Sequence, residues 1–190
     1  GSPLRPLGSA RYLGSTLAFG LAFAAMMAYI SASPFVFQTM VGLTTVQYGL
    51  LFGFNALVLA ATSAASARLT ATRSVDGVLG AGLAILLGAS LTLLAVVLLG
   101  AAPGWVIPPI VVAVGSLGLI LGNATALALS AVPRAAGIGS AVLGALQFAL
   151  AAAVAPLVSL GGQHTAVPLA VVMTVTAALA MTSHLVTRGR

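Results

Sequence analysis

Several uncharged polar side chains lie within long segments of this sequence that are otherwise apolar. Three of them are amides, Asn55, Asn123 and Gln147, and phenylalanines lie close to two of these, at Phe52 and Phe148. An amide both donates and accepts hydrogen bonds, so in an apolar interior it needs a partner. That partner is either a neighbouring helix, which makes the amide a packing device, or a bound lipophilic molecule, which makes the amide part of a substrate cavity.

A second group of polar residues surrounds a proline, Pro34. Two stripes lie here at helical spacing: Tyr29, Ser33 and Phe37 on one face, and Ser31, Phe35 and Gln38 on another. Pro34 has no N–H, so the carbonyl of Ile30 loses its helical donor, and we expect a kink with Ser31 or Ser33 as the substitute donor. A kinked helix that only packs against its neighbours has the same pattern.

The candidate residues for a cavity lining are Tyr29, Ser33, Phe37, Gln38, Phe52, Asn55, Asn123, Gln147 and Phe148. We expect the amides to converge at mid-depth with Tyr29 and Ser33. Helical spacing alone does not decide which stripe beside Pro34 faces the cavity, and we favour the stripe that contains the tyrosine.

Titratable side chains are too few for acid–base or metal chemistry within the apolar segments. Asp76 is the sole acidic side chain, the histidines are His164 and His184, and there is no cysteine. We therefore expect no enzymatic activity, no metal site and no cofactor. Asp76 lies close in sequence to Arg68 and Arg73, and we expect these three residues to form a charge cluster in one loop.

The composition requires a membrane around most of the chain. Of the 190 residues, 61% are hydrophobic and only 4% are charged, whereas soluble domains carry about 25% charged residues. A β-barrel is excluded because its strands alternate apolar and polar residues. The net charge of +6 comes from scattered arginines rather than a basic patch, so we expect lipids and not nucleic acid as partners.

Proline, glycine and arginine divide the chain into six apolar spans. We predict an all-α transmembrane bundle with helices at about residues 13–41, 45–69, 75–101, 105–131, 135–160 and 165–187. Residues 1–12 are then an N-terminal segment or linker, 13–187 the bundle and 188–190 a tail. Spans one, two, four and five hold the polar residues, so we expect a three-plus-three repeat with spans three and six outside, against lipid.

Loop charges indicate the orientation of these spans. The arginines are Arg5, Arg11, Arg68, Arg73, Arg134, Arg188 and Arg190. All of them fall on one side of the six-span arrangement, which the positive-inside rule assigns to the cytoplasm. We expect a multi-pass protein of the bacterial inner membrane with both termini in the cytoplasm.

Two stretches contain combinations of residues that distinguish protein families better than polarity alone does. The first contains Tyr29, Ile30, Ser31, Ser33, Pro34, Phe35, Val36 and Gln38, followed by Tyr48, Gly49, Phe52, Asn55 and Ala56. The second contains Gly122, Asn123, Ala136, Gly137, Ser140, Ala141, Gly144, Gln147 and Phe148. They resemble the seventh and eighth helices and the tenth-to-eleventh helix region of Bcr/CflA-type drug-resistance transporters, in the drug:proton antiporter branch of the major facilitator superfamily.

The resemblance implies that this chain is the C-terminal half of such a transporter, with helices seven to twelve. Members of that family export lipophilic drugs and antibiotics by alternating access, against proton entry, and the resemblance places spans one, two, four and five around the central cavity. The intramembrane acidic residues of the family belong to the N-terminal half. We therefore expect proton coupling only together with that half or with a second copy of the chain.

The small residues of span five support a different hypothesis. Gly137, Ala141 and Gly144 are among several that would let a neighbouring helix approach closely. On this hypothesis the chain is a structural or assembly subunit that dimerises through small-residue faces and transports nothing.

Overall fold

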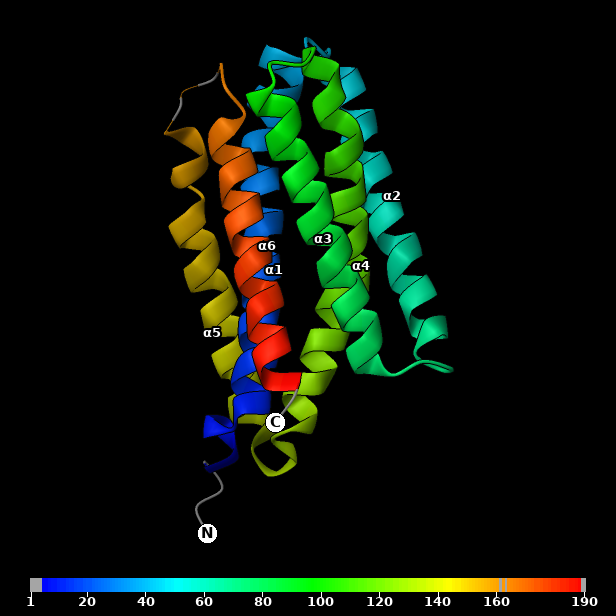
Figure 1. The fold of residues 1–190 in the computed structure, drawn as a ribbon, viewed down its shortest axis with the longest axis vertical. Coiled ribbons are helices and arrows are strands. Elements are labelled where there is room, and N and C mark those ends of the chain that lie inside the picture. The colour runs from blue at the N-terminus through cyan, green and yellow to red at the C-terminus, as the bar shows by residue number, and fades with distance from the viewer. Residues whose placement is uncertain (1–4, 161, 163, 189–190) are drawn as a thin grey trace.

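Six long helices form one bundle in the computed structural model of this chain, which describes residues 5–160, 162 and 164–188 (Figure 1). They are α1 Ala10–Pro34, α2 Thr45–Leu69, α3 Val75–Leu98, α4 Ile107–Ser130, α5 Ala136–Val154 and α6 Val167–Arg188. The described residues contain no strand. All six helical regions are long and apolar enough to cross a membrane, so this all-α bundle is a multi-pass membrane protein.

Short helical segments accompany the long helices. They are η1 Arg5–Gly8, η2 Phe35–Met40, η3 Pro103–Val106, η4 Pro133–Ala135 and η5 Leu157–Ser159. With η2 counted as the continuation of α1, the predicted spans agree with the helices to within a few residues. The fifth span differs most, because α5 ends at Val154, shortly before Pro156, and η5 completes the crossing.

Local sequence explains where several helices begin. Ser9 and Ser74 each accept a hydrogen bond from a backbone N–H in the first turn of α1 and α3. Thr44 and Gln47 form a reciprocal capping box at the start of α2. At the end of the bundle away from the termini, Gly42 has a φ of +83°, a value that side chains with a Cβ rarely adopt.

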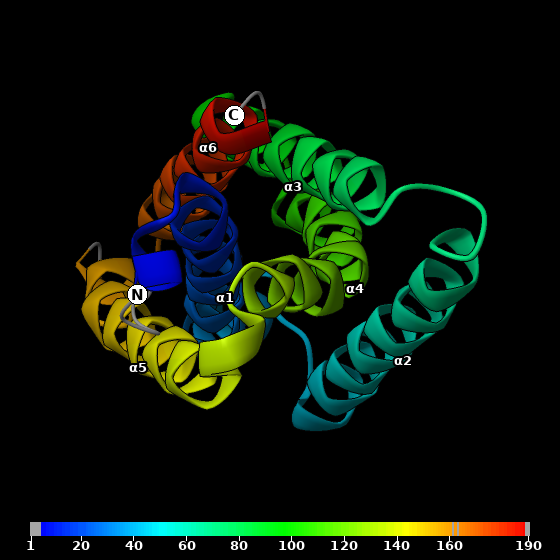
Figure 2. The same cartoon turned by 90° about the horizontal axis from the view of Figure 1, so that it is seen from below.

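The helices pack in a pattern that repeats after three. α1 and α4 lie against each other at the centre, while α3 packs on α4, α6 packs on α1, and α3 also contacts α6. α2 packs on α4, and α5 packs on α1 (Figure 2). Exchanging the first three helices for the last three leaves this pattern unchanged, and α1 and α4 run in opposite directions (Figure 1). The packing is therefore that of an inverted three-plus-three repeat.

The burial of the helices within the chain does not follow their polarity. Most of the apolar stretch is buried in α1 (61%) and α4 (56%), whereas 11% is buried in α2 and 22% in α5. The corresponding values for α3 and α6 are 33% and 39%. Within this chain α2 and α5 are therefore the least buried helices, and the placement of the third and sixth spans against lipid stays a prediction. Amide content does not report burial, because Leu, Ala and Gly surfaces pack equally well against protein and lipid.

The described arginines lie at one end of the bundle, which we call the arginine end. It holds the first turn of α1, the last turns of α2 and α6, and the turns between α2 and α3 and between α4 and α5 (Figure 1). Arg190 lies outside the described residues. Trp105, at the opposite end, is 64% exposed, as an interfacial anchor would be. That the arginine end faces the cytoplasm stays a prediction.

Candidate functional site

The helix around Pro34 changes its geometry at the proline. α1 ends at Pro34 and continues as the π-helical segment η2, in which Val41 N–H donates to the Val36 carbonyl five residues back, at 3.0 Å. Ser33 Oγ donates to the Ile30 carbonyl at 3.0 Å. That carbonyl is the one left free by Pro34, so the predicted substitution by a serine is confirmed. Single π-helical turns of this kind are frequent at functional sites.

The stripe that contains the tyrosine faces the interior of the bundle. Tyr29, Ser33 and Phe37 are 3%, 1% and 0% exposed. In the other stripe Ser31 is exposed, and Gln38 is half-buried near the turn that follows η2, where it accepts a bond from Thr45 Oγ1 at 3.3 Å. Gln38 therefore lies outside the interior group of polar residues.

Two hydrogen bonds connect this stripe to α2. Asn55 Nδ2 donates to the Tyr29 hydroxyl oxygen at 2.8 Å, and the hydroxyl oxygens of Ser33 and Tyr48 are 3.0 Å apart. Because the Ser33 hydrogen is directed at Ile30, Tyr48 is the donor in the second pair. Both bonds lie between elements that share few other contacts, so they fix the first half of α2 against α1.

Aromatic rings strengthen the same connection. Tyr29, Phe37, Tyr48 and Phe52 form a closed circle in which neighbouring ring centroids are 6.1–6.3 Å apart. These separations are within the range of favourable aromatic pairs. We call the four rings together with Ser33 and Asn55 the α1–α2 cluster.

The Asn55 amide is only partly satisfied. Its side chain is 1% exposed, and Oδ1 is buried without a hydrogen-bond donor among the residues that the structure describes. A buried polar atom left in this state costs about 1–3 kcal/mol. The cost is recovered when a bound molecule offers an N–H or O–H group to Oδ1.

A cavity of about 160 Å³ adjoins this amide. It lies between α1, α2 and α4, and its lining includes Tyr29, Phe52, Asn55, Met26 and Val114. An apolar cavity of about 150 Å³ is large enough to bind benzene. The site can therefore hold one ring or a similar lipophilic group of a larger molecule, while Oδ1 of Asn55 lies closed off behind its wall.

The amide of α4 does not belong to this cluster. Asn123 Nδ2 donates to Ser66 Oγ at 2.8 Å and to the Leu119 carbonyl at 2.7 Å. Ser66 lies eleven residues beyond Asn55 on α2, which is about 16 Å along a helix. Asn123 therefore serves the contact of α2 and α4 close to the arginine end.

The amide of α5 lies in a third place. Gln147 is half-buried, and the adjacent Phe148 is 65% exposed and makes an edge-to-face contact with Phe23 of α1, with centroids 5.9 Å apart. The expectation that all three amides meet Tyr29 and Ser33 at one point is thus not met within this chain. The repeat places α2 and α5 on opposite sides of the central pair, so their polar residues stay apart.

The predicted loop cluster is wrong in its partners. Asp76 Oδ2 is 2.7 Å from Arg188 Nε, and Asp76 Oδ1 is 3.9 Å from Nδ1 of the buried His184. Within the described part of the chain, Arg68 and Arg73 form no ion pair with Asp76 and are exposed. The first turn of α3 packs beside the last turn of α6, and opposite charges at these helix ends are favourable.

Two residues that take part in these contacts were not predicted from the sequence. Tyr48 stands four residues before Phe52, and this spacing on one helix face was the available signal. Arg188 lies more than a hundred residues from Asp76, and sequence spacing gives no indication of that pairing.

Comparisons with known proteins support membership in a transporter superfamily. The chain is 28% identical over 168 residues to a Bacillus subtilis (strain 168) protein described as an uncharacterized MFS-type transporter, YdgK. The alignment covers 88% of this chain and 42% of that protein, so the chain spans less than half the length of this relative. No protein-family model matches the chain.

Proposed function

We propose that this chain is the C-terminal six-helix half of a major facilitator carrier of the Bcr/CflA type, which exports lipophilic drugs by alternating access. The resemblance of two stretches to that family, the inverted three-plus-three packing and the MFS-type relative support this proposal. The carrier resides in the bacterial inner membrane, with the arginine end in the cytoplasm.

The observation that carries the proposal is the unpartnered oxygen of Asn55 beside a lipophilic cavity. Packing alone would favour an amide with both ends satisfied. A drug that presents an N–H or O–H group next to an aromatic ring would match this site: the ring would fill the cavity, and a small movement of the Asn55 side chain would bring Oδ1 to the donor. Asn123, Gln147 and Phe148 would contact the cargo at other depths of the path.

The exposed helices indicate what completes the carrier. Leu50 and Leu57 of α2 are each 70% exposed, and Val142 and Phe148 of α5 are 44% and 65% exposed. We propose that the N-terminal half, or a second copy of this chain, covers these two helices. Asp76 lies at the arginine end and pairs with Arg188, so a proton-carrying carboxylate within the membrane would come from the other half.

The test is drug accumulation in an efflux-deficient bacterial strain. The strain expresses this chain alone, the full reading frame that encodes it, or that reading frame with Asn55→Ala. We expect the full reading frame to lower the accumulation of lipophilic drugs with N–H donors, and Asn55→Ala to reverse most of this decrease. Thr92→Ala is the matched control, because Thr92 is exposed on α3 and bonds only its own helix.

The proposal fails if the full reading frame, present in the membrane at normal amounts, leaves the accumulation of a broad drug panel unchanged. The assembly-subunit hypothesis has its own support, because a Cβ added to Gly137 or Gly144 would meet open space on α5. That hypothesis predicts dimers of the chain alone that Gly144→Leu abolishes, together with no drug export.

A further inference from the structure

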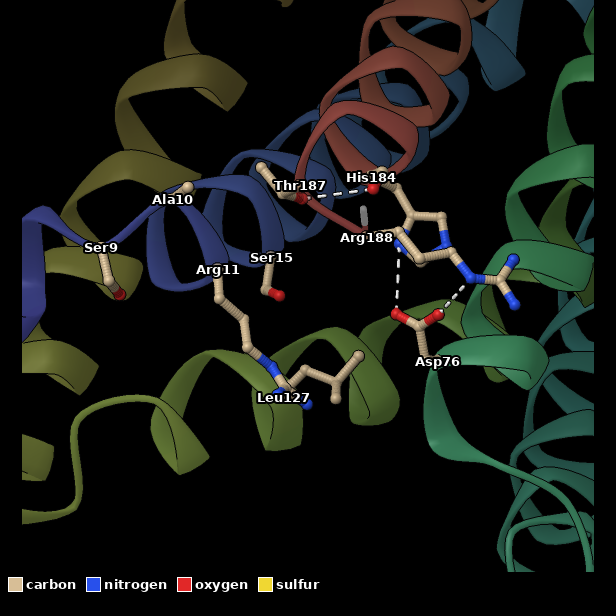
Figure 3. Close-up of a pocket in the computed structure, with 9 residues that line it drawn as sticks. All are labelled: Ser9, Ala10, Arg11, Ser15, Asp76, Leu127, His184, Thr187 and Arg188. Carbon is tan, nitrogen blue, oxygen red and sulfur yellow. Dashed lines mark hydrogen bonds and ion pairs between the residues drawn. The ribbon is translucent and has the colours of Figure 1, made fainter. Parts of the chain in front are cut away.

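Two spaces inside the bundle differ in what they can hold. One, of about 330 Å³, opens at the arginine end, and Arg11, Asp76 and Arg188 are among the residues that line it (Figure 3). The other is the cavity of about 160 Å³ beside the α1–α2 cluster, and its lining residues are uncharged. The two spaces share no lining residue. The uncharged cavity is the one that suits a lipophilic group.

The uncharged cavity opens at α2 and ends at α4. Two of its lining residues on α2 are exposed, Ala56 and, at 37%, Phe52. Of the described residues that line it, Val114 alone comes from α4, and Val114 is 4% exposed. Val114 therefore forms the floor of the cavity, away from its mouth.

The floor cannot retreat from a larger occupant. A Cβ added to Gly115 would lie 3.0 Å from Val58 Cγ1 of α2. A Cβ added to Gly118, one turn beyond Val114, would lie 2.6 Å from the Ser63 nitrogen of α2. The backbone of α4 is thus already packed closely on α2 at this depth. Because a β-branched valine has one strongly preferred χ1 in a helix, the two methyl groups of Val114 also stay in place.

A second wall of the cavity is fixed as well. The rings of Tyr29 and Phe52 are stacked, with centroids 6.1 Å apart and planes 14° apart, and Asn55 donates to the Tyr29 hydroxyl oxygen. Met26 is an adaptable part of the lining, because its unbranched thioether side chain fits irregular outlines. The space available to an occupant is therefore limited at Val114, while Met26 adjusts to its outline.

We propose that Val114 is the specificity-determining residue of this cavity and limits its occupant to a group about the size of one six-membered ring. An apolar cavity of about 150 Å³ binds benzene. Loss of the two Val114 methyl groups would make room for a larger group, and a larger side chain at this position would fill the cavity. One methylene in an apolar pocket changes discrimination about 10–200-fold. Val114 has this role in drug export only if the cavity is the cargo site of the proposed function.

Ring binding is measured on the purified full chain by nuclear magnetic resonance of isotope-labelled methionine methyl groups. The chain has five methionines, of which Met26 lines the cavity, whereas the adjacent Met27 is not among its lining residues. A bound aromatic ring shifts the resonance of a methyl group that it contacts. We expect benzyl alcohol to shift the Met26 resonance to saturation and to leave Met27 unchanged. Met26→Leu identifies the signal.

Two compounds with the same hydroxymethyl group and different ring systems then test the floor. Benzyl alcohol and 1-naphthalenemethanol are titrated into each variant, and the ratio of their affinities is compared with that of the unmodified chain in the same detergent. We expect Val114→Ala to shift this ratio at least about tenfold towards the two-ring compound. We expect Val114→Phe to abolish the binding of benzyl alcohol.

Val112→Ala and Val112→Phe are the matched controls. Val112 is 50% exposed on the same helix and is not among the lining residues of this cavity, so neither control should change the binding of either compound. Circular dichroism confirms that each variant keeps its helices.

Size selection at Val114 is excluded if Val114→Ala and Val112→Ala give the same affinity ratio, or if Val114→Phe binds benzyl alcohol as well as Val112→Phe does. A Met26 resonance that benzyl alcohol leaves unchanged in the unmodified chain would also overturn the proposal, because the cavity would not hold a ring. Drug accumulation with the full reading frame is a separate measurement, and its failure would contradict the proposed function without changing the size selection measured on the chain.

Discussion

The two halves of the inverted repeat, α1–α3 and α4–α6, occupy equivalent places in the bundle but differ in their chemistry. In the first half, the contact of α1, η2 and α2 holds a π-helical segment, four aromatic rings and a buried amide with a free acceptor. In the second half, Asn123 is bonded to α2 and to its own helix, and Gln147 is half-buried. Both halves have the same fold, whereas all residues of the α1–α2 cluster come from the first half.

The peripheral helices show the same division. α2 crosses α4 at Gly118, where an added Cβ would lie 2.6 Å from the Ser63 nitrogen and 2.8 Å from the Leu59 carbonyl oxygen. At the equivalent contact of α5 with α1, a Cβ on Gly20 would meet only leucine side chains, with Leu150 Cδ1 nearest at 2.9 Å. α2 is therefore held by close backbone approach, and α5 by side chains that can adjust.

The largest expected effect distinguishes these two crossings. Gly118→Ala should destabilise the chain by about 1–3 kcal/mol, because backbone atoms of α2 cannot move aside as a side chain can. Gly20→Ala should cost less than about 1 kcal/mol, since the leucine ends can change rotamer. Unfolding in a mixed detergent titration measures both values, and equal costs would contradict the proposed difference between the crossings.

A smaller effect should be nearly equal in the two halves. Thr62 Oγ1 donates to the Gly115 carbonyl at 2.7 Å, and the Tyr12 hydroxyl donates to the Gly139 carbonyl at 2.7 Å. Each bond connects one peripheral helix to the rest of the bundle. Thr62→Val and Tyr12→Phe should each cost about 1 kcal/mol, as interhelical hydrogen bonds in membranes do. A several-fold difference in the same unfolding assay would show that only one peripheral helix depends on its polar contact.

The bond inside the α1–α2 cluster should be weaker than its burial suggests. A double-mutant cycle with Tyr29→Phe and Asn55→Ala should give a coupling energy of about 0.6 kcal/mol, the average for hydrogen bonds between transmembrane helices. The equivalent cycle with Asn123→Ala and Ser66→Ala should give a similar value. A coupling energy above about 2 kcal/mol for the first pair alone would mean that the cluster is a packing device.

The ion pair between α3 and α6 should contribute least. Asp76 is 32% exposed and Arg188 is 54% exposed, and pairs open to solvent contribute about 0.2–1 kcal/mol. Arg188→Gln should therefore lower stability by less than about 1 kcal/mol, and by less still at high salt, because salt screens exposed charges. Unfolding at low and high ionic strength tests this, and a salt-independent loss would indicate a role other than charge pairing.

Hydropathy and loop punctuation were sufficient to predict the helices and their order. Both depend only on residues that are close together in the chain. The bond from Ser33 to the carbonyl that Pro34 leaves free was predictable for the same reason. The inverted repeat was also visible in the distribution of amides, because the polar helices occupy corresponding positions in both halves.

Contacts between distant residues were not predictable in this way. Asn123 bonds Ser66, and Asp76 pairs with Arg188, because helix packing brings residues together that are 57 and more than a hundred positions apart. Local spacing instead favoured the neighbouring Arg68 and Arg73 for Asp76. The burial of each helix within the chain was not predictable for the same reason, since an apolar helix has the same sequence character against lipid and against protein.

The most direct test of the proposed site compares two amides, of which one lines the cavity. Asn55 and Asn123 each donate an interhelical bond of 2.8 Å, but of the two Asn55 alone lines the cavity and has a fully buried oxygen without a donor among the described residues. Drug export by the full reading frame is measured for Asn55→Ala and Asn123→Ala at matched amounts in the membrane. A binding role for Asn55 predicts that Asn55→Ala raises the KM for donor-bearing drugs at least about tenfold, while Asn123→Ala leaves the KM close to the unmodified value. Equal effects of the two variants on KM would contradict that role.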